Sequence, residues 1–576
     1  MDVLTLNSVL VVTTALLLGW LAVRDKLNYW AKRGVPYVSP WTCLTGTLAF
    51  LFKRQAIYET FVAQYDALEG HPFGGTFQLL NPSVMLRDPA MIKEWLIKGF
   101  TNFHDRGPEP DEKLDKLSGN LFQLTGDKWR LVRQKLSPIF STAKLRIMYQ
   151  TLKGCAEELN AHLQARCQAT GETELDVKDL VSNYTMDVIG ACAMGIKCNA
   201  IQDPEHCTMK KVVKRMFRFN WRLSLFQFLE MAHPRLPRLL GLSPRDKEVE
   251  AYLEEITKEA IRMKQQDTTG NRKDFLQLLM KYSEEEGAES ANGEAQSKEM
   301  ANGDAQSKKI ANGNAQSKEI ANGDAKSKEI ANGDAKSKEI ANGDAKSKEI
   351  ANGDAKAMEH EDPIITENVM MGVIASFLSA GLEPVSATVT FCAYELAHHP
   401  EVQEKLFKEI QAVRKESGGE IKYDDLKRLH YLDQVVNETL RKYPIAPILG
   451  RKCTEAFQVP DSKLVLEKGI NLIISTMSLH HDPKYFPEPE KFDPERFSEE
   501  NVNKIIPGSY LPFGDGPRFC IAMRLALMDV KTMIITLVSD YTLHTCPKTV
   551  KRIEIDRHLF TLTPKGQVRL RLKKRS

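Results

Sequence analysis

The stretch LPFGDGPRFCIAMRLALMDVKTMIITLVSDY, from Leu511 to Tyr541, decides how the rest of this sequence is interpreted. Up to Arg518 it is rich in glycine, proline and aromatic residues, which predicts an irregular loop. After Cys520 apolar residues recur at a helical spacing, which predicts a helix. Cys520 is therefore expected at a helix N-terminus, where free backbone N–H groups and the positive end of the helix dipole favour a thiolate. A thiolate beneath a glycine loop that admits a flat ligand predicts a metal site or a reactive sulfur.

The remaining composition points to an ordinary globular protein. The chain has 576 residues, of which 42% are hydrophobic and 27% are charged, as is usual for folded domains. Its net charge of +3 is too small to indicate a nucleic-acid partner. The ten cysteines form no CxxC pair, which indicates reduced thiols in a cytosol-facing protein. Apart from Cys520, each cysteine is expected to be a small core residue.

The segment FGDGPRFC resembles the haem-ligating loop of the cytochrome P450 superfamily, Phe-x-x-Gly-x-Arg-x-Cys-x-Gly. Phe513, Gly516, Arg518 and Cys520 match this pattern, and Ala522 stands where the family has its last glycine. The resemblance implies haem b as the cofactor, with the Cys520 thiolate as the axial ligand of the iron. The segments PFGDGPRFCIAMR and DFLQLLMKY are most similar in sequence to insect microsomal members of this superfamily, in the clan that metabolises foreign compounds.

Two upstream motifs carry a charged network of the same family. They are ETLR, from Glu438 to Arg441, and PERF, from Pro494 to Phe497. By itself, a glutamate three residues before an arginine predicts only a solvated pair on a helix face. The resemblance implies instead that Glu438, Arg441 and Arg496 form a buried structural network that holds the proximal side of the haem together.

A third motif, WRLVR, from Trp129 to Arg133, carries two residues that face a haem propionate in the family. Arg451 and Arg518 correspond to further propionate partners. A guanidinium group suits this role because it binds a carboxylate through two parallel hydrogen bonds. With Phe513 and Cys520, these residues complete the cofactor-binding set that the resemblance implies.

A proline stands inside what is otherwise one long helix. The apolar segment from about Thr366 to Ala397 predicts a single helix, and the stretch SAGLEPVSA within it contains Pro384. A proline in a helix interior costs about 3 kcal/mol or more, because it lacks an N–H and clashes with the preceding turn. The sequence therefore raises the question of what this helix does.

The resemblance places this helix over the distal face of the haem. Ala380, Gly381 and Glu383 match the family pattern Ala/Gly-Gly-x-Asp/Glu-Thr, and Pro384 replaces the threonine that helps to deliver protons. Ser386, about 200° further round a helix, is a poor substitute for it. We expect Glu383 to relay protons through water. We also expect the helix to be opened near Gly381, as in the family, so that the proline breaks little.

Three functions are compatible with these residues. The first is insertion of one oxygen atom from O2 into a lipophilic small molecule, such as a xenobiotic, a hormone or a lipid, with water as the second product. The second is rearrangement of a peroxide or dehydration of an oxime, since family members with these activities often lack the threonine. The third is haem binding without catalysis. We expect the first, which makes the protein a monooxygenase and an oxidoreductase.

Electrons for this reaction have to come from another protein, because no flavin or nicotinamide domain follows the haem domain. The resemblance implies NADPH–cytochrome P450 reductase as the donor, with cytochrome b5 as a second candidate. A basic stretch suits an acidic partner, although a solvated helix face is the alternative. Its residues are Lys128, Arg130, Arg133, Lys135, Lys144 and Arg146.

The N-terminus predicts a membrane anchor. Residues Val3–Val23 carry no charge, and about 20 such residues span a bilayer as a helix. Only Asp2 precedes them, whereas Arg24 and Lys26 follow, so the positive-inside rule places the body in the cytosol, at the endoplasmic reticulum membrane. A cleaved signal peptide is the alternative, but a basic n-region and an A-x-A site are missing. The prolines of RGVPYVSP, Arg33–Pro40, predict a stiff non-helical spacer.

Two other segments concern partners. From Ala291 to Lys356 a decapeptide such as ANGDAKSKEI repeats, with one large apolar residue per copy. Burial of one isoleucine does not offset the ordering of ten residues, so we predict a disordered surface insertion, with binding of a partner as the alternative. MFRFNWRLSLFQFLEM, Met216–Met231, interleaves aromatic residues with arginine. It suits a roof over the substrate pocket that contacts membrane lipid, or alternatively a buried helix pair.

The predicted fold is a mostly helical cytochrome P450 fold that encloses one haem, with a smaller β-rich part. Strands are expected around Phe73–Asp88 and Ile553–Leu572. The predicted organisation is an anchor at residues 1–24, a basic and proline-rich linker at 25–40 and a haem-thiolate catalytic domain at 41–576, interrupted by the insertion at 291–356.

Overall fold

Helices dominate the computed structural model, which describes Thr14 and residues 24–52, 54–107, 109–168, 170–217, 221–233, 235–266, 279–282 and 365–575. The elements discussed below belong to the unit formed by Met1–Met280 and Ile365–Ser576. The predicted insertion at 291–356 lies outside the described residues, and so does the predicted anchor apart from Thr14 and Arg24.

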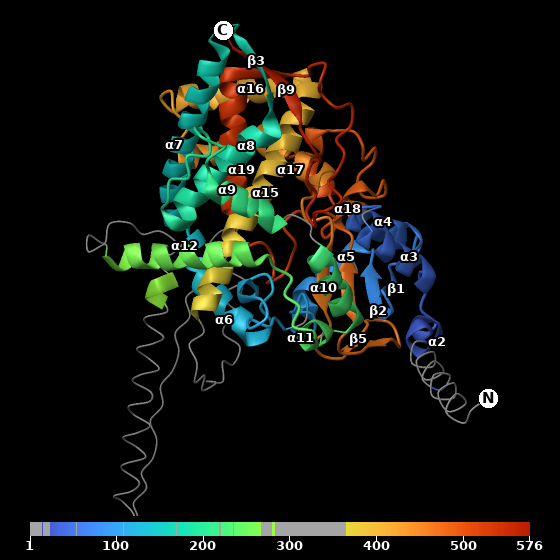
Figure 1. The fold of residues 1–576 in the computed structure, drawn as a ribbon. Coiled ribbons are helices and arrows are strands. Elements are labelled where there is room, and N and C mark those ends of the chain that lie inside the picture. Colours follow the sequence, from blue (N-terminus) through green and yellow to red (C-terminus); the bar gives the residue numbers. More distant parts are fainter. Residues whose placement is uncertain are drawn as a thin grey trace, which may run out of the picture. The chain divides into compact units, whose positions relative to one another are not determined.

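The helices and strands are as follows (Figure 1). The α-helices are α2 (Tyr29–Lys32), α3 (Pro40–Leu51), α4 (Ile57–Asp66), α5 (Pro89–Ile97), α6 (Gly126–Leu136), α7 (Thr142–Cys167), α8 (Val177–Ile189), α9 (Thr208–Phe217), α10 (Trp221–Ala232), α11 (Leu236–Leu239), α12 (Lys247–Gln266), α15 (Glu367–His398), α16 (Pro400–Glu416), α17 (His430–Lys442), α18 (Thr476–His481) and α19 (Met523–Asp540). The strands are β1 (Phe73–Gln78), β2 (Asn81–Leu86), β3 (Glu172–Asp176), β4 (Leu449–Lys452), β5 (Phe457–Gln458), β6 (Val465–Leu466), β7 (Asn471–Ile474), β8 (Tyr541–His544) and β9 (Arg569–Lys574).

Three small sheets accompany the helices. Their strand orders are β1-β2-β7-β4, β3-β9-β8 and β5-β6. The predicted strands near residues 73–88 are confirmed as β1 and β2. The C-terminal strand begins later than predicted, at Arg569, and only an isolated bridge between Ile555 and Pro564 precedes it. The strands between Leu449 and Ile474 were not predicted, because they are only two to four residues long.

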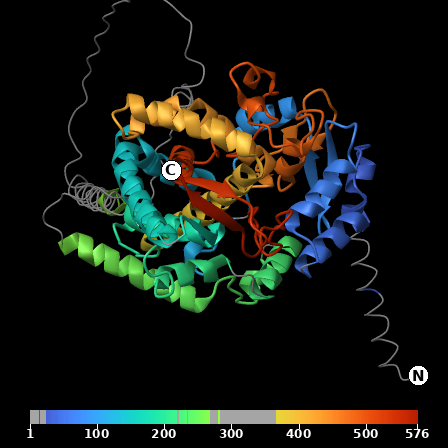
Figure 2. The ribbon, with the colours of Figure 1, turned by 90° about the horizontal axis from the view of Figure 1, so that it is seen from above.

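The segment before α3 is part of the sheet region and packs against it. Trp30 is fully buried and donates a hydrogen bond from Nε1 to the carbonyl of Thr76, at 3.0 Å. The N–H of Gly75 donates to the carbonyl of Pro36 at 2.7 Å, and the N–H of Val38 donates to the carbonyl of Gly75 at 2.9 Å. The stretch 33–39 is non-helical, as expected, and β1 holds it in place. In Figure 2 the blue elements of this region lie beside one another at one side of the helices.

Helix α15 is the long helix that the sequence predicted. Thr366 caps its start by accepting the N–H of Val369 at Oγ1, at 3.2 Å. By length and composition it is apolar enough to cross a membrane, but most of it is buried among other helices, as in the core of a soluble protein. Figure 1 shows it in yellow beside α8 and α19.

The expectation that α15 is opened near Gly381 is wrong, because the helix runs unbroken from Glu367 to His398 with Pro384 inside it. Gly381 has a packing role instead. A Cβ atom on Gly381 would lie 2.3 Å from Cδ1 of Ile189 in α8, which is closer than two carbon atoms approach. The glycine therefore lets α8 and α15 approach each other closely.

Candidate functional site

The loop around Cys520 is closed by its own backbone. The N–H of Cys520 donates to the carbonyl of Phe513 at 3.0 Å. Helix α19 begins at Met523, two residues later than the sequence suggested, with Ala522 as its N-cap. The φ angle of Ala522 is −96°, which every L-residue adopts, so alanine fits where the family pattern has glycine.

A glycine fixes how this loop meets α5. Gly516 has a φ of +69°, and a Cβ atom on it would lie 2.0 Å from the carbonyl oxygen of Leu96. Both the backbone conformation and the lack of space therefore require glycine here. By contrast, Gly514 in the same loop also has a positive φ, of +74°, but its nearest neighbour is Leu449 at 3.9 Å.

The environment of the Cys520 thiol contains opposing influences. Burial raises its pKa, whereas the N–H of Ala522 and the charges of Arg133 and Arg106 lower it, with burial as the largest contribution. The N–H at the start of α19 therefore favours a thiolate, as the sequence predicted, but burial has the larger effect on the pKa. A coordinated metal ion deprotonates a thiol outright, so the two arginines and the N–H would support the ligand rather than create it.

Four arginines gather near Cys520, and we call Arg106, Arg133, Arg451 and Arg518 the arginine cluster. Arg133 comes from α6, Arg451 from β4, Arg518 from the Cys520 loop and Arg106 from the loop after α5. The N–H of Lys452 donates to the carbonyl of Asp105 at 2.8 Å, which brings Arg106 beside β4.

The arginine cluster has more positive charge than its surroundings balance. Burial lowers the pKa of Arg451 to about 9 and that of Arg518 to about 9, and the nearby Arg106 lowers both further. Burial also lowers the pKa of Arg106 and of Arg133 to about 10. Among the described residues, the carboxylates that oppose these shifts are Asp515 near Arg451 and Asp105 near Arg518. Two buried and two half-buried cations against two carboxylates make a site that fits the two propionates of haem.

Arg518 differs from the other three because most of its N–H donors are already used within the protein. It donates to the carbonyls of His104 and Leu124, at 2.7 Å each, and to that of Leu121 at 3.3 Å. Its guanidinium also lies 4.0 Å from the ring centroid of Trp129. Arg518 therefore ties the Cys520 loop to the segment before α6, and the remaining three arginines have more N–H groups to offer an anion.

Trp129 and Arg133 lie one turn apart on α6. Trp129 is 4% exposed, and the guanidinium of Arg133 lies 4.9 Å from the ring centroid of Phe519, next to Cys520. Arg106 was missed by the sequence analysis. It lies in the short stretch HDRG with no periodicity around it, and only the pairing of its loop with β4 brings it to the site.

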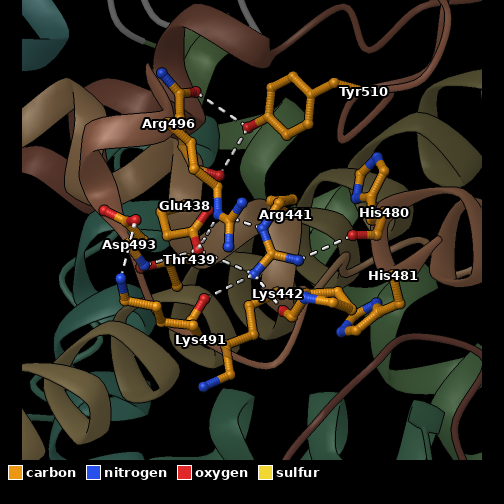
Figure 3. A network of polar contacts seen from close by, with 12 residues as sticks. Glu438, Thr439, Arg441, Lys442, His480, His481, Lys491, Asp493, Arg496 and Tyr510 are labelled. Carbon is orange, nitrogen blue, oxygen red and sulfur yellow. Dashed lines mark hydrogen bonds and ion pairs between the residues drawn. The ribbon is translucent and has the colours of Figure 1, made fainter. Parts of the chain in front are cut away.

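The motifs ETLR and PERF meet in one buried network (Figure 3). Arg441 donates to Glu438 through Nε at 2.8 Å and through Nη2 at 2.9 Å, and both side chains are fully buried. Nε of Arg496 lies 3.5 Å from Oε1 of Glu438, and the N–H of Asp493 donates to the same oxygen at 2.9 Å. Burial raises the pKa of Glu438, and Arg441 opposes this. The surface-pair alternative for Glu438 and Arg441 is therefore excluded.

This network is connected to the Cys520 loop through His480. Arg441 donates through Nη1 to the carbonyl of His480 at 2.9 Å, and Nε2 of His480 accepts the N–H of Leu511 at 2.9 Å. Burial lowers the pKa of His480 to about 3, so its ring is neutral and remains an acceptor. Leu511 is the first residue of the loop that carries Cys520, so the network holds the start of that loop in position.

Glu383 is half-buried and faces a cavity of about 690 Å³. Burial raises its pKa, while Lys178 and a hydrogen bond with Thr563 oppose the shift. The cavity is lined mainly by charged and polar side chains from β3, α8, α9, α15 and the C-terminal loop: Asp176, Lys178, Asp179, Ser182, Lys214, Arg215, Glu383, Ser386, Asp556 and His558. Glu383 thus lies between the interior and a polar space suited to water.

A half-buried cysteine in a glycine-rich loop, faced by arginines within a mostly helical protein, defines the class of haem-thiolate proteins. The family model described as Cytochrome P450 matches residues 39–302 and 341–570, and the chain belongs to this family. Cytochromes P450 bind haem b through a cysteine thiolate, and the chain is a monooxygenase-type oxidoreductase.

Curated insect proteins are similar along nearly the whole chain. Probable cytochrome P450 6d4 of Drosophila melanogaster is 31% identical over 98% of both chains. Cytochrome P450 6j1 of Blattella germanica is 30% identical over 96% of this chain and 95% of its own. The predicted resemblance to insect members of the family is therefore confirmed.

Proposed function

We propose that this protein inserts one oxygen atom from O2 into a lipophilic xenobiotic, hormone or lipid, with electrons from NADPH–cytochrome P450 reductase. The observation that carries the proposal is the arginine cluster beside Cys520. In this proposal Cys520 ligates the haem iron, and Arg106, Arg133 and Arg451 hold the propionates. Trp129, Phe513 and Arg518 shape the rim of the site. Bound haem supplies the oxygen-activating chemistry, and a thiolate ligand favours O–O cleavage.

The chain's own residues have two further tasks in this function. Glu438, Arg441 and Arg496 keep the Cys520 loop in place, as their buried contacts indicate. Glu383 holds a proton at its carboxyl group and exchanges it with water in the polar cavity, which its raised pKa supports. Pro384 supplies no hydroxyl, so the proton has to reach the oxygen by another route.

The proposed location is the endoplasmic reticulum membrane, with the body in the cytosol behind the anchor at 1–24. Exposed apolar side chains near the N-terminal segment support a membrane contact. Trp41, in the first turn of α3, is 67% exposed, and Phe52, directly after α3, is 72% exposed. Phe560 lies 6.1 Å from Phe50 of α3, ring to ring, and is itself largely exposed. Leu239 at the end of α11 adds a further exposed apolar side chain. Such residues suit insertion into the lipid interface.

The proposed organisation keeps 41–576 as one catalytic domain with the insertion at 291–356. The match to the family model supports this, because its gap between residues 302 and 341 falls inside the repeat. The segment 216–231 divides between α9 and α10, with residues 218–220 outside the described part of the chain. Leu225 and Phe228 of α10 are each 37% exposed, which suits the membrane-facing roof better than a buried helix pair.

The reductase, with cytochrome b5 as a second candidate, would dock on the basic stretch of α6 and α7. Lys128 pairs with Glu112 at 2.5 Å and Arg146 pairs with Asp424 at 2.8 Å. Both the lysine and the arginine are exposed in these pairs, although Glu112 is half-buried. Such pairs near the surface contribute only about 0–1 kcal/mol, so an acidic partner can replace the internal carboxylates. The docking should weaken as ionic strength rises.

The test compares two activities of the haem-loaded protein. We expect product from a lipophilic substrate panel only with NADPH and reductase present, together with the thiolate-type band of the reduced protein with CO. Brisk turnover of a hydroperoxide without any NADPH-dependent product would support the isomerase or dehydratase alternative. Absence of the thiolate-type band would contradict both, and Cys520→Ser is the control that should abolish the band.

A further inference from the structure

Three arginines gather beside the first turn of α4, although they come from opposite ends of the chain. Arg54 lies between α3 and α4, whereas Arg552 and Arg557 lie in the loop between β8 and β9. Nη1 of Arg557 donates to the carbonyl of Arg54 at 3.0 Å, across 503 residues of sequence. Burial raises the pKa of Tyr58 in α4, and the charges of Arg552 and Arg557 oppose this, so both lie near its hydroxyl group. We call Arg54, Arg552 and Arg557 the arginine triad.

The arginine triad has no acidic partner of its own. All three side chains are exposed, and within the described parts of the chain no carboxylate forms an ion pair with them. The carboxylates nearby are engaged elsewhere. Glu554 pairs with Lys565 at 3.0 Å, and Glu59 accepts the N–H of Ala56 at 2.9 Å. The triad therefore offers unpaired guanidinium groups to an anion from outside.

Exposed aromatic side chains adjoin the triad on both of its segments. Phe52 precedes its first arginine and Phe560 follows its last one, and both rings are largely exposed. Trp41 and Phe52 are about three helical turns apart, so they lie on the same side of α3. The opposite side of α3 is buried through Cys43, Thr47 and Phe50. Aromatic rings beside arginines match the two layers of a lipid interface, since rings enter the acyl boundary and cations stay with the headgroups.

The chemistry of the triad favours an anionic lipid over a zwitterionic one. A guanidinium group binds two oxygens of a phosphate through parallel hydrogen bonds. A basic residue near an anionic leaflet strengthens binding about fivefold, whereas the choline group of a zwitterionic lipid cancels the phosphate charge. The proposed anchor would keep this surface close to a bilayer, because the anchor ends at residue 24 and α3 begins at Pro40.

We propose that the arginine triad binds the phosphate groups of anionic phospholipids while Trp41, Phe52 and Phe560 enter the acyl boundary. The loop that carries Arg552 and Arg557 also lines the polar cavity, through Asp556 and His558. Anionic lipid therefore holds one wall of that cavity at the membrane surface. The inference rests on the proposed membrane location and does not depend on the reaction.

The test is hydrogen exchange, read by mass spectrometry, of the full haem-loaded chain in lipid nanodiscs. One set of discs contains phosphatidylcholine alone, and the other contains phosphatidylcholine with phosphatidylglycerol. We expect the main-chain amides of residues 550–560 to exchange about fivefold or more slowly in the anionic discs. Arg54→Gln combined with Arg552→Gln should remove most of this difference. The double variant keeps the bond from Arg557 to the main-chain carbonyl of residue 54, so the loop stays attached.

Arg166→Gln is the matched control, because Arg166 is an exposed arginine at the end of α7, away from the triad. It should behave as the wild type, and equal haem absorbance should show that all variants are folded. Equal exchange of the wild type in both discs, or a difference that persists in the double variant, would overturn the inference. Slowing by inorganic phosphate in phosphatidylcholine discs, to the extent seen with phosphatidylglycerol, would overturn the assignment to lipid.

Failure of the proposed function gives other results. A wrong membrane location would leave the chain outside discs of either composition. A wrong reaction would leave the lipid effect in place, while the wild type gave no NADPH-dependent product.

Discussion

Asp529 of α19 is a buried acid with no basic partner among the described residues, and its removal should stabilise the protein at neutral pH. It is 2% exposed, and its Oδ1 has no hydrogen-bond partner among the described residues. Burial raises its pKa to about 7, and the nearby hydroxyl of Tyr184 lowers it only in part. Tyr184 of α8 is also next to the thiols of Cys155 and Cys192, so uncharged groups surround the carboxyl group. The informative substitution is Asp529→Asn, which keeps the shape and removes the titration.

The size and sign of the effect on the free energy of unfolding follow from the shift in the pKa of Asp529. The pKa is about 7 in the folded state against 3.8 for an exposed aspartate. The folded protein therefore binds the proton more tightly between about pH 4 and 7, and the free energy of unfolding falls as pH rises through that window. One pKa unit corresponds to about 1.36 kcal/mol, so the full window represents about 4 kcal/mol. Between pH 5.5 and 8 the expected change is about 2 kcal/mol.

The assay is urea unfolding of the haem-loaded protein, followed by circular dichroism from pH 5.5 to 8. The stability of Asp529→Asn relative to the wild type should increase by about 2 kcal/mol over this range. Asp461 provides a matched control, because it is exposed in a turn with a φ of 55° that asparagine also adopts. Asp461→Asn should show a constant difference from the wild type. A pH-independent difference for Asp529→Asn would refute the reasoning.

Three further predictions concern the Cys520 loop and its supports. Gly516→Ala should reduce haem retention severely, because its Cβ would lie 2.0 Å from the carbonyl oxygen of Leu96. Gly514→Ala is the control, and it should lower the free energy of unfolding by only about 1 kcal/mol. The absorbance of bound haem per protein compares the two variants. Glu438→Gln should lower the free energy of unfolding by about 3–5 kcal/mol, since it leaves Arg441 buried without its counter-charge; an effect below 1 kcal/mol in urea unfolding would argue against the network. Removal of haem should lower the melting temperature, and salt should restore more stability to the haem-free protein than to the loaded one, because ions screen the arginine cluster; calorimetry at low and high salt measures both.

Local patterns in the sequence were sufficient for the elements that depend on neighbouring residues. The loop that ends at Cys520, the long helix with Pro384 and the strands near residues 73–86 all follow from residue types and spacing within one segment. The family was also readable from the sequence, because FGDGPRFC is a contiguous motif whose residues act together on one ligand. These features need little information from distant parts of the chain.

The proximal network shows what a local pattern does not contain. The sequence around Glu438 and Arg441 is equally compatible with a solvated ion pair on a helix surface. Only the resemblance to the family suggested that the pair is buried. In the structure, Arg441 also donates to the carbonyls of His480 and Pro489, which come from segments about forty to fifty residues later. Burial of an ion pair depends on such partners, and partners from distant segments are set by tertiary packing.

By itself, then, the sequence determined the family, the cofactor and the cysteine that we propose as its ligand. The tertiary structure decided which charged groups lie at the site and which of them are already paired. It added Arg106 to the arginine cluster, showed that Arg518 is committed to carbonyls, and directed Glu383 toward a polar cavity. It also showed that α15 continues unbroken through Pro384. The physical reason is that burial, pairing and helix continuity depend on groups brought together in space, whereas residue type and spacing describe only what lies nearby along the chain.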